Sequence, residues 1–204
     1  MIVIADNDII HKLALCNLLD ELLVWLDVPP NEIWVLPELK FRVRKKLKSH
    51  ADALTAFNRF LQKTAEIPAA LPATLQQFST LDVGEQQLFA VFVEQIQPPR
   101  LVTGDKRALK QITTLSQNDT SLREKLAGRV DCLESIMLGL IEQVGFDAIN
   151  PKIDAMADKV LAMAFGVGRT QAHTVEALQS FLGNLRQDAP FVILRDGSIS
   201  SRHE

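Results

Sequence analysis

Short apolar runs alternate with longer amphipathic stretches in this sequence, and that alternation constrains the fold more than any other feature. The runs occupy residues 1–5, 33–36, 101–103 and 129–133. Runs of this length are typical of strands that are buried on both faces of a parallel sheet. Strands that alternate with helices form βαβ crossovers. We therefore predict an α/β fold with three layers, α/β/α, around a mostly parallel central sheet.

The stretches between and after these runs predict helices. Pro37 suits the first turn of a helix that runs to about residue 63. Pro98-Pro99 closes the helix predicted at 84–95. The segment 65–83 contains two prolines and little periodicity, so we expect it to be irregular. The predicted helices are 9–26, 37–63, 84–95, 105–117, 134–144, 151–165 and 170–187.

The pattern changes near residue 146. Beyond residue 134 the sequence is mainly helical, with glycines between the segments, until Phe191-Val192-Ile193-Leu194 and Asp196-Gly197 predict a last strand and turn. We predict a domain at 1–146 and a mainly helical C-terminal extension at 147–204. Such an extension is suited to covering a sheet edge, forming a homodimer or receiving a partner segment.

Composition excludes several classes of protein. Of the 204 residues 47% are hydrophobic and the net charge is −3, so the chain can bury a core but gives no overall sign of nucleic-acid binding. Cys16 and Cys132 lack zinc-ligand or disulfide spacing and are predicted to be reduced core thiols. No basic leader precedes the first strand, and charges interrupt every long apolar stretch. We expect a cytoplasmic protein with no membrane span.

Acidic residues stand at the ends of three apolar runs. Asp6 follows residues 1–5, Glu85 follows residues 81–84, and Asp105 follows the third predicted strand. Ligands of parallel α/β sheets gather at the carboxyl ends of the strands, so these carboxylates are candidates to converge. Oxygen ligands suit Mg²⁺ or Mn²⁺, and such ions activate water and offset charge on a phosphodiester. The pattern favours metal-dependent phosphodiester hydrolysis.

The same acids also fit a simpler role as helix caps. Asp82 and Glu85 have the spacing of a capping box, which we favour for Asp82. Asp6 and Asp8 precede a predicted helix, and Asp105 opens another, so each is a candidate N-cap. Both roles remain open for Asp6, Glu85 and Asp105.

Three segments together resemble the PIN-domain nucleases. They are Asp6-Asn7-Asp8-Ile9-Ile10, Gly84-Glu85-Gln86-Gln87-Leu88 and Thr103-Gly104-Asp105-Lys106-Arg107. Their order and spacing match the family across roughly residues 1–135, and the remainder of the chain does not contribute. The resemblance implies a metal-dependent ribonuclease, with RNA as substrate and Mg²⁺ or Mn²⁺ as cofactor. It also makes a toxin with an antitoxin protein as partner a plausible biological role.

The resemblance assigns roles residue by residue. Asp6, Glu85 and Asp105 stand at the positions of the catalytic, metal-binding acids, and Asp8 stands where the family has a small polar residue that assists the metal site. A fourth family acid has three candidates, which are Asp8, Glu38 and Asp82.

Basic residues suggest where a nucleic-acid backbone binds. The run after Pro37 comprises Lys40, Arg42, Arg44, Lys45, Lys46 and Lys48. It fits a phosphate track, and Arg42, Arg44 and Lys45 are candidate substrate contacts; a solvated helix face is the alternative. Thr103, Lys106 and Arg107 are further candidates because they flank Asp105. The phenylalanines at helical spacing, Phe41, Phe57, Phe60, Phe89 and Phe92, are predicted to be core, so no base-stacking platform is expected.

Two other functions fit part of the pattern. In a haloacid-dehalogenase-like phosphohydrolase, Asp6 is the nucleophile, Asp8 the acid/base and Asp105 a late Mg²⁺ ligand. That scheme leaves Glu85 without a role and has Ile10 where a hydroxyl residue is expected. The third reading is a catalytically decayed PIN-like module that only binds RNA or a protein partner.

Overall fold

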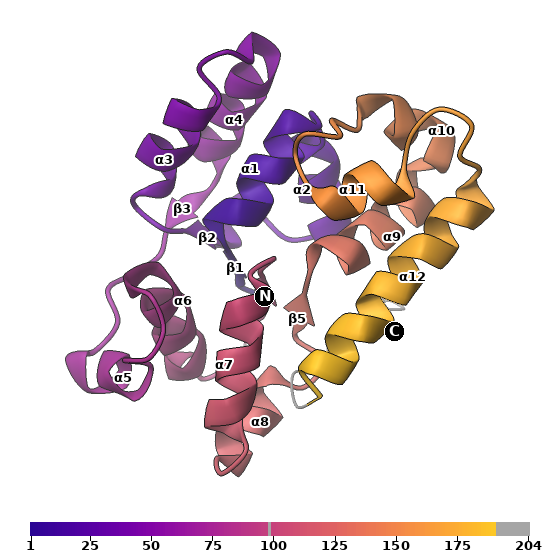
Figure 1. The fold of residues 1–204 in the computed structure, drawn as a ribbon. Helices are drawn as coiled ribbons and strands as arrows, with labels where there is room; N and C mark the ends of the chain where they lie inside the picture. The colour runs from indigo at the N-terminus through magenta and orange to yellow at the C-terminus, as the bar shows by residue number, and fades with distance from the viewer. Residues whose placement is uncertain (98, 191–204) are drawn as a thin grey trace, which may run out of the picture.

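A computed structural model describes residues 1–97 and 99–190, which fold around one parallel sheet (Figure 1). Its strands are β1 (Val3–Ala5), β2 (Ile33–Val35), β3 (Ala65–Glu66), β4 (Arg100–Val102) and β5 (Val130–Asp131). Their order is β3-β2-β1-β4-β5, and all neighbours are parallel. The four strands predicted from apolar runs are confirmed. β3 escapes prediction because an alanine and a glutamate make no apolar run.

Helices cover both faces of the sheet. Successive side chains of β1 point to opposite faces, so Val3 and Ala5 belong to one buried cluster and Ile4 to another. Because both clusters are apolar, the strands carry no polar alternation. The α/β class and the parallel sheet are therefore as predicted.

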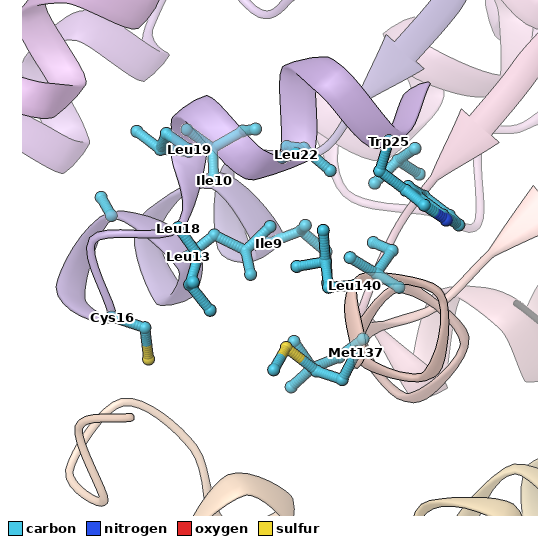
Figure 2. Close-up of a cluster of buried hydrophobic side chains, with 14 of the residues drawn as sticks. Ile9, Ile10, Leu13, Cys16, Leu18, Leu19, Leu22, Trp25, Met137 and Leu140 are labelled. Carbon is cyan, nitrogen blue, oxygen red and sulfur yellow. The ribbon is translucent and has the colours of Figure 1, made fainter. Parts of the chain in front are cut away.

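The first face packs against α1 (Asn7–Leu15), α2 (Leu19–Leu26), α3 (Leu39–Lys46), α4 (Ala51–Lys63) and α9 (Leu133–Val144). Figure 2 shows part of this cluster, where side chains of α1 and α2 meet Met137 and Leu140 of α9. Cys16 is buried within it, and Cys132 is buried on the other face; both are free thiols, as predicted.

Two of the predicted helices are wrong in length because each is interrupted. The predicted helix 9–26 is α1 and α2, separated where Asn17 takes a left-handed conformation with φ of 50°. Asparagine tolerates that conformation better than most residues. The predicted helix 37–63 is likewise α3 and α4, which are separated by residues 47–50.

The second face packs against α5 (Pro72–Gln77), α6 (Val83–Glu94), α7 (Lys106–Ser116) and α8 (Thr120–Leu126). Phe89 and Phe92 of α6 are buried here, and Phe57 and Phe60 of α4 are buried on the first face, as predicted. The prediction that Phe41 belongs to the core is wrong, because its side chain on α3 is 68% exposed.

The described C-terminal part, residues 146–190, is mainly helical. It contains α10 (Phe146–Ile149), α11 (Lys159–Ala164) and α12 (Gln171–Asp188), together with the 3-10 turn η2 (Asn150–Lys152). Another 3-10 turn, η1 (Pro30–Glu32), lies in the N-terminal part and precedes β2. The predicted helix 151–165 is thus mostly wrong, since only α11 and part of η2 are helical. The strand predicted at 191–194 lies outside the described residues.

One helix of this part contributes to both hydrophobic clusters. Leu178 of α12 belongs to the first cluster, while Leu182 and Leu185 belong to the second. The domain boundary near residue 146 remains a prediction. Within residues 1–97 and 99–190, no helix combines the length and apolar character needed to cross a membrane.

An ion pair lies inside the sheet region. Arg100 of β4 and Asp131 of β5 are both buried and form a direct ion pair. The Arg100 guanidinium also lies 4.1 Å from the ring centre of Trp25 on α2. This pair joins β4, whose end carries Asp105, to its neighbour β5.

Candidate active site

The carboxyl ends of the parallel strands meet at one edge of the sheet, and a small cleft of about 170 Å³ lies there. The predicted acids Asp6, Glu85 and Asp105 all line this cleft, and so do the three candidates for the fourth acid. Its full lining is Asp6, Asn7, Asp8, Leu36, Glu38, Arg42, Val43, Lys46, Asp82, Gly84, Glu85 and Asp105.

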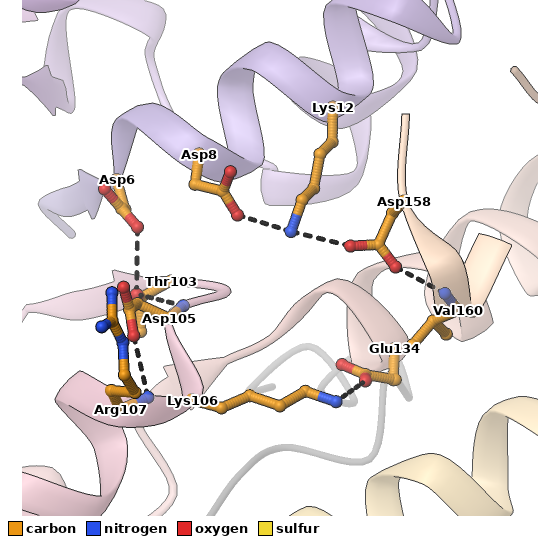
Figure 3. A network of polar contacts seen from close by, with 10 residues as sticks. All are labelled: Asp6, Asp8, Lys12, Thr103, Asp105, Lys106, Arg107, Glu134, Asp158 and Val160. Carbon is orange, nitrogen blue, oxygen red and sulfur yellow. Dashed lines mark hydrogen bonds and ion pairs between the residues drawn. The ribbon is translucent and has the colours of Figure 1, made fainter. Parts of the chain in front are cut away.

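A threonine links two of the acids (Figure 3). The buried hydroxyl of Thr103 donates to Asp6 Oδ2 at 3.2 Å and accepts from the Asp105 N–H at 3.3 Å. The Asp6 backbone N–H donates to the Val102 carbonyl at 2.8 Å, which holds Asp6 at the end of β1. Asp6 is also the N-cap residue of α1, yet its side chain makes no capping hydrogen bond. Thr103 therefore positions Asp6 toward Asp105 instead.

Asp105 and Glu85 each serve as part of a helix cap as well. Asp105 Oδ1 accepts from the N–H groups of Arg107 at 2.8 Å and Ala108 at 3.1 Å. Asp82 and Glu85 form the predicted capping box, in which Asp82 Oδ1 accepts from the Glu85 N–H and Glu85 Oε2 accepts from the Asp82 N–H. The caps fix the backbone that carries both side chains at the cleft.

Two glycines allow segments around the cleft to lie close to one another. A Cβ atom at Gly84 would lie 3.4 Å from Glu38 Oε1 and 3.3 Å from Leu36 Cδ1, so the start of α6 sits against the segment before α3. A Cβ atom at Gly104 would lie only 2.9 Å from Ile9 Cδ1, which is closer than real contacts allow. A side chain at Gly104 would thus require the end of the Ile9 side chain to move.

The acids of the cleft interact electrostatically. Burial raises the pKa of Asp6 to about 6, and the charge of Asp8 adds to the effect, although the nearby N–H groups of Asp8 and Asn7 and the hydroxyl of Thr103 oppose it. Burial also raises the pKa of Glu85 to about 7, with further contributions from the charges of Asp82, Asp105 and Asp6. Near neutral pH both groups therefore bind protons that ordinary carboxyls would release.

The raised pKa values of Asp6 and Glu85 predict an unusual pH dependence of the free energy of unfolding. Because the pKa values of Asp6 and Glu85 are higher in the folded state, protonation favours folding, and that stabilisation is lost as pH rises through about 6 to 7. We expect metal-free wild-type protein to lose more unfolding free energy between about pH 5 and about pH 8 than Glu85→Gln does, since glutamine cannot ionise. Urea denaturation at both pH values measures this, and equal losses would contradict it.

Asp8 is held by residues that sequence reasoning missed. Lys12 Nζ lies 2.5 Å from Asp8 Oδ2 and 2.9 Å from Asp158 Oδ2, and its side chain is only 14% exposed (Figure 3). Lys12 follows Asp8 by four residues, which is a readable helix-pairing signal. Asp158 caps α11, far along the chain, and no sequence signal connects it to Asp8.

The predicted substrate-binding residues separate into two groups. Arg42 of α3 lines the cleft, and Lys46 does so too, although sequence reasoning gave Lys46 no individual role. Arg44 instead hydrogen-bonds Asn58 at 3.0 Å in a neighbouring groove, and Lys45 is exposed on α3. Lys106 lies 3.4 Å from buried Glu134. Of these candidates, Arg42 lines the cleft and Thr103 hydrogen-bonds Asp6 through its side chain, while Arg107 donates its backbone N–H to Asp105.

The donor chemistry of the cleft suits Mg²⁺ or Mn²⁺, because carboxylate and amide oxygens are hard ligands. The buried Oδ1 atom of Asn7 lines the cleft and has no hydrogen-bond partner among the described residues. The spacing is not that of a formed metal site: within residues 1–97 and 99–190, no group of three or more His, Cys, Asp or Glu side chains is placed to hold an ion together. Ion binding here would require the carboxylates to approach one another.

The chain was compared with known proteins by sequence and by structure. No protein-family model, curated protein or solved structure gives a significant match to it.

Proposed function

We propose that this protein is a metal-dependent ribonuclease of the PIN type that hydrolyses phosphodiester bonds with Mg²⁺ or Mn²⁺. The observation that carries the proposal is the convergence of Asp6, Glu85 and Asp105 on one cleft at the carboxyl edge of a parallel sheet. The electrostatics of Glu85 also support it: burial raises its pKa, the charges of Asp82, Asp105 and Asp6 add to the effect, and carboxyl groups perturbed in this way are more typical of functional sites than of structural ones.

Six residues in or beside the cleft have a part in the proposed reaction. Asp6, Glu85 and Asp105 would hold the ion, which supplies an activated water and offsets charge on the phosphate. Thr103 keeps Asp6 and Asp105 in a fixed relation through its two hydrogen bonds. Arg42 and Lys46, on the α3 wall of the cleft, attract the RNA backbone.

The biological setting rests on the family resemblance. It favours a cytoplasmic toxin that an antitoxin protein holds inactive. Glu85 distinguishes the nuclease from the phosphohydrolase, because the phosphohydrolase scheme gives this cleft residue no task.

A matched pair of variants tests the proposal. Asp105 and Asp119 both cap a helix through their side chains, at α7 and α8, but only Asp105 lines the cleft. We expect Asp105→Asn to reduce Mn²⁺-dependent cleavage of mixed RNA by about 100-fold or more, because a metal ion contributes several kcal/mol to the transition state. Asp119→Asn should leave cleavage within about twofold of wild type, as expected of a change that affects only stability.

The assay is run with Mn²⁺ and with EDTA, and RNA fragments are separated on denaturing gels. Cleavage that persists in EDTA, or equal activity of the two variants, would contradict the metal mechanism. RNA binding without any cleavage would favour the non-catalytic module. Release of phosphate from small phosphomonoesters would favour the phosphohydrolase.

A further inference from the structure

The outer face of α3 carries one exposed aromatic ring among cations. Leu39 and Val43 of this helix are buried, while Phe41 is 68% exposed. The ring of Phe41 is therefore largely accessible to a ligand.

Helical geometry places Phe41 on a ridge between two hollows. At about 100° per residue, Lys45 falls within about 40° of Phe41 on the helix surface. Arg42 and Lys46 lie farther round and line the acidic cleft.

On the other side of the ridge lies the second groove. Its volume is about 720 Å³, and Lys40, Arg44 and Lys48 line it together with apolar residues such as Leu54 and Leu61. Cations of one helix thus face both hollows, and the ring of Phe41 stands between them.

The side chains around Phe41 suit a nucleic acid better than a protein partner. The cores of protein interfaces are depleted in lysine and depend on contiguous apolar surface, whereas the neighbours of Phe41 on α3 include Lys40, which lies over its ring, and Lys45. Single-strand binders combine a cationic path for phosphates with aromatic rings on which bases stack. Lys40 Nζ lies 5.4 Å from the centre of the Phe41 ring, so a positive charge accompanies the ring itself.

We propose that Phe41 stacks against an unpaired base of the RNA, so that the α3 ridge selects single-stranded substrate beside the cleft. The inference rests on the proposed function, in that RNA is the substrate. It assigns Phe41 a binding role that sequence reasoning did not give it.

Binding measurements test the inference separately from cleavage. The probe is a labelled oligouridine of about 12 nucleotides, within the site sizes of single-strand binders. The comparison probe is its duplex with oligoadenosine. Fluorescence anisotropy is recorded with Ca²⁺ in place of Mn²⁺, and gels confirm that the RNA stays intact.

Four variants separate stacking from other contacts. We expect Phe41→Ala to bind the single strand about tenfold more weakly, in line with the loss of one stacked base, while duplex binding changes less than about twofold. Phe41→Leu should resemble Phe41→Ala because it has no π face, and Phe41→Trp should bind at least as well as wild type. Val24→Ala on α2 removes an apolar side chain that is 62% exposed and serves as the matched control, with no change expected.

The outcomes are distinguishable. If wild type binds single strands and Phe41→Ala binds them equally well, the stacking inference fails while the ribonuclease proposal stands. Equal weakening of single-strand and duplex binding, or full binding by Phe41→Leu, would also overturn stacking. If wild type binds neither RNA, the RNA function and the inference fail together.

Discussion

Asp6→Asn is expected to reduce metal-dependent RNA cleavage by about 100-fold or more, because it removes a charged oxygen ligand from the proposed site. The same change is expected to stabilise the metal-free protein by about 1 kcal/mol at neutral pH, since burial and Asp8 penalise the ionised carboxylate. Asparagine retains an oxygen that accepts the Thr103 hydroxyl. Opposite effects on activity and stability are the signature of a functional residue.

Cleavage assays and urea denaturation on the same preparations measure both effects. Asp20→Asn is the control, because Asp20 is an exposed acid that pairs with Arg59 at 2.8 Å on α4, away from the cleft lining. Full activity of Asp6→Asn would remove the catalytic role from this cleft. Lost activity together with a large loss of stability would make Asp6 a structural residue.

Asp131→Asn is expected to destabilise the fold by about 3–5 kcal/mol, since it leaves the buried guanidinium of Arg100 without its carboxylate. That loss is a large share of the about 5–15 kcal/mol that stabilises a typical domain. Trp25 contacts Arg100, so its fluorescence reports the transition directly during urea denaturation.

Two comparisons isolate the cause of this effect. Asp188→Asn removes an exposed pair with Lys110, 3.0 Å apart, and should cost less than about 1 kcal/mol. The double variant Arg100→Leu with Asp131→Leu should be more stable than Asp131→Asn, because two apolar groups leave no isolated charge. A cost of less than about 1 kcal/mol for Asp131→Asn would show that the pair is unimportant for stability.

The sequence was informative about the sheet for a definite physical reason. Strands buried on both faces are mostly apolar, so β1, β2, β4 and β5 can be read from their runs, although Arg100 and Asp131 add a buried ion pair to β4 and β5. Helix interruptions were less readable. The break at Asn17 depends on one residue in a left-handed conformation, and neighbouring residues keep the same apolar periodicity on both sides.

The candidate site was predictable where it depends on strand ends. Asp6 and Asp105 follow β1 and β4, which are adjacent in the sheet, so their approach is a consequence of topology. The capping box of Asp82 and Glu85 was also readable from spacing. Long-range partners were not: the contact between Lys12 and Asp158 depends on where α11 packs, which local patterns do not specify.

The position of β1 at the centre of the sheet has a consequence for how the protein is made. β1 is synthesised well before its neighbour β4, which begins at Arg100, and before α12, which contributes to both hydrophobic clusters and ends at Asp188. Such distant pairings delay folding until α12 has left the ribosome. Nascent chains should therefore expose apolar segments until that point, and chaperones are the natural means of shielding them.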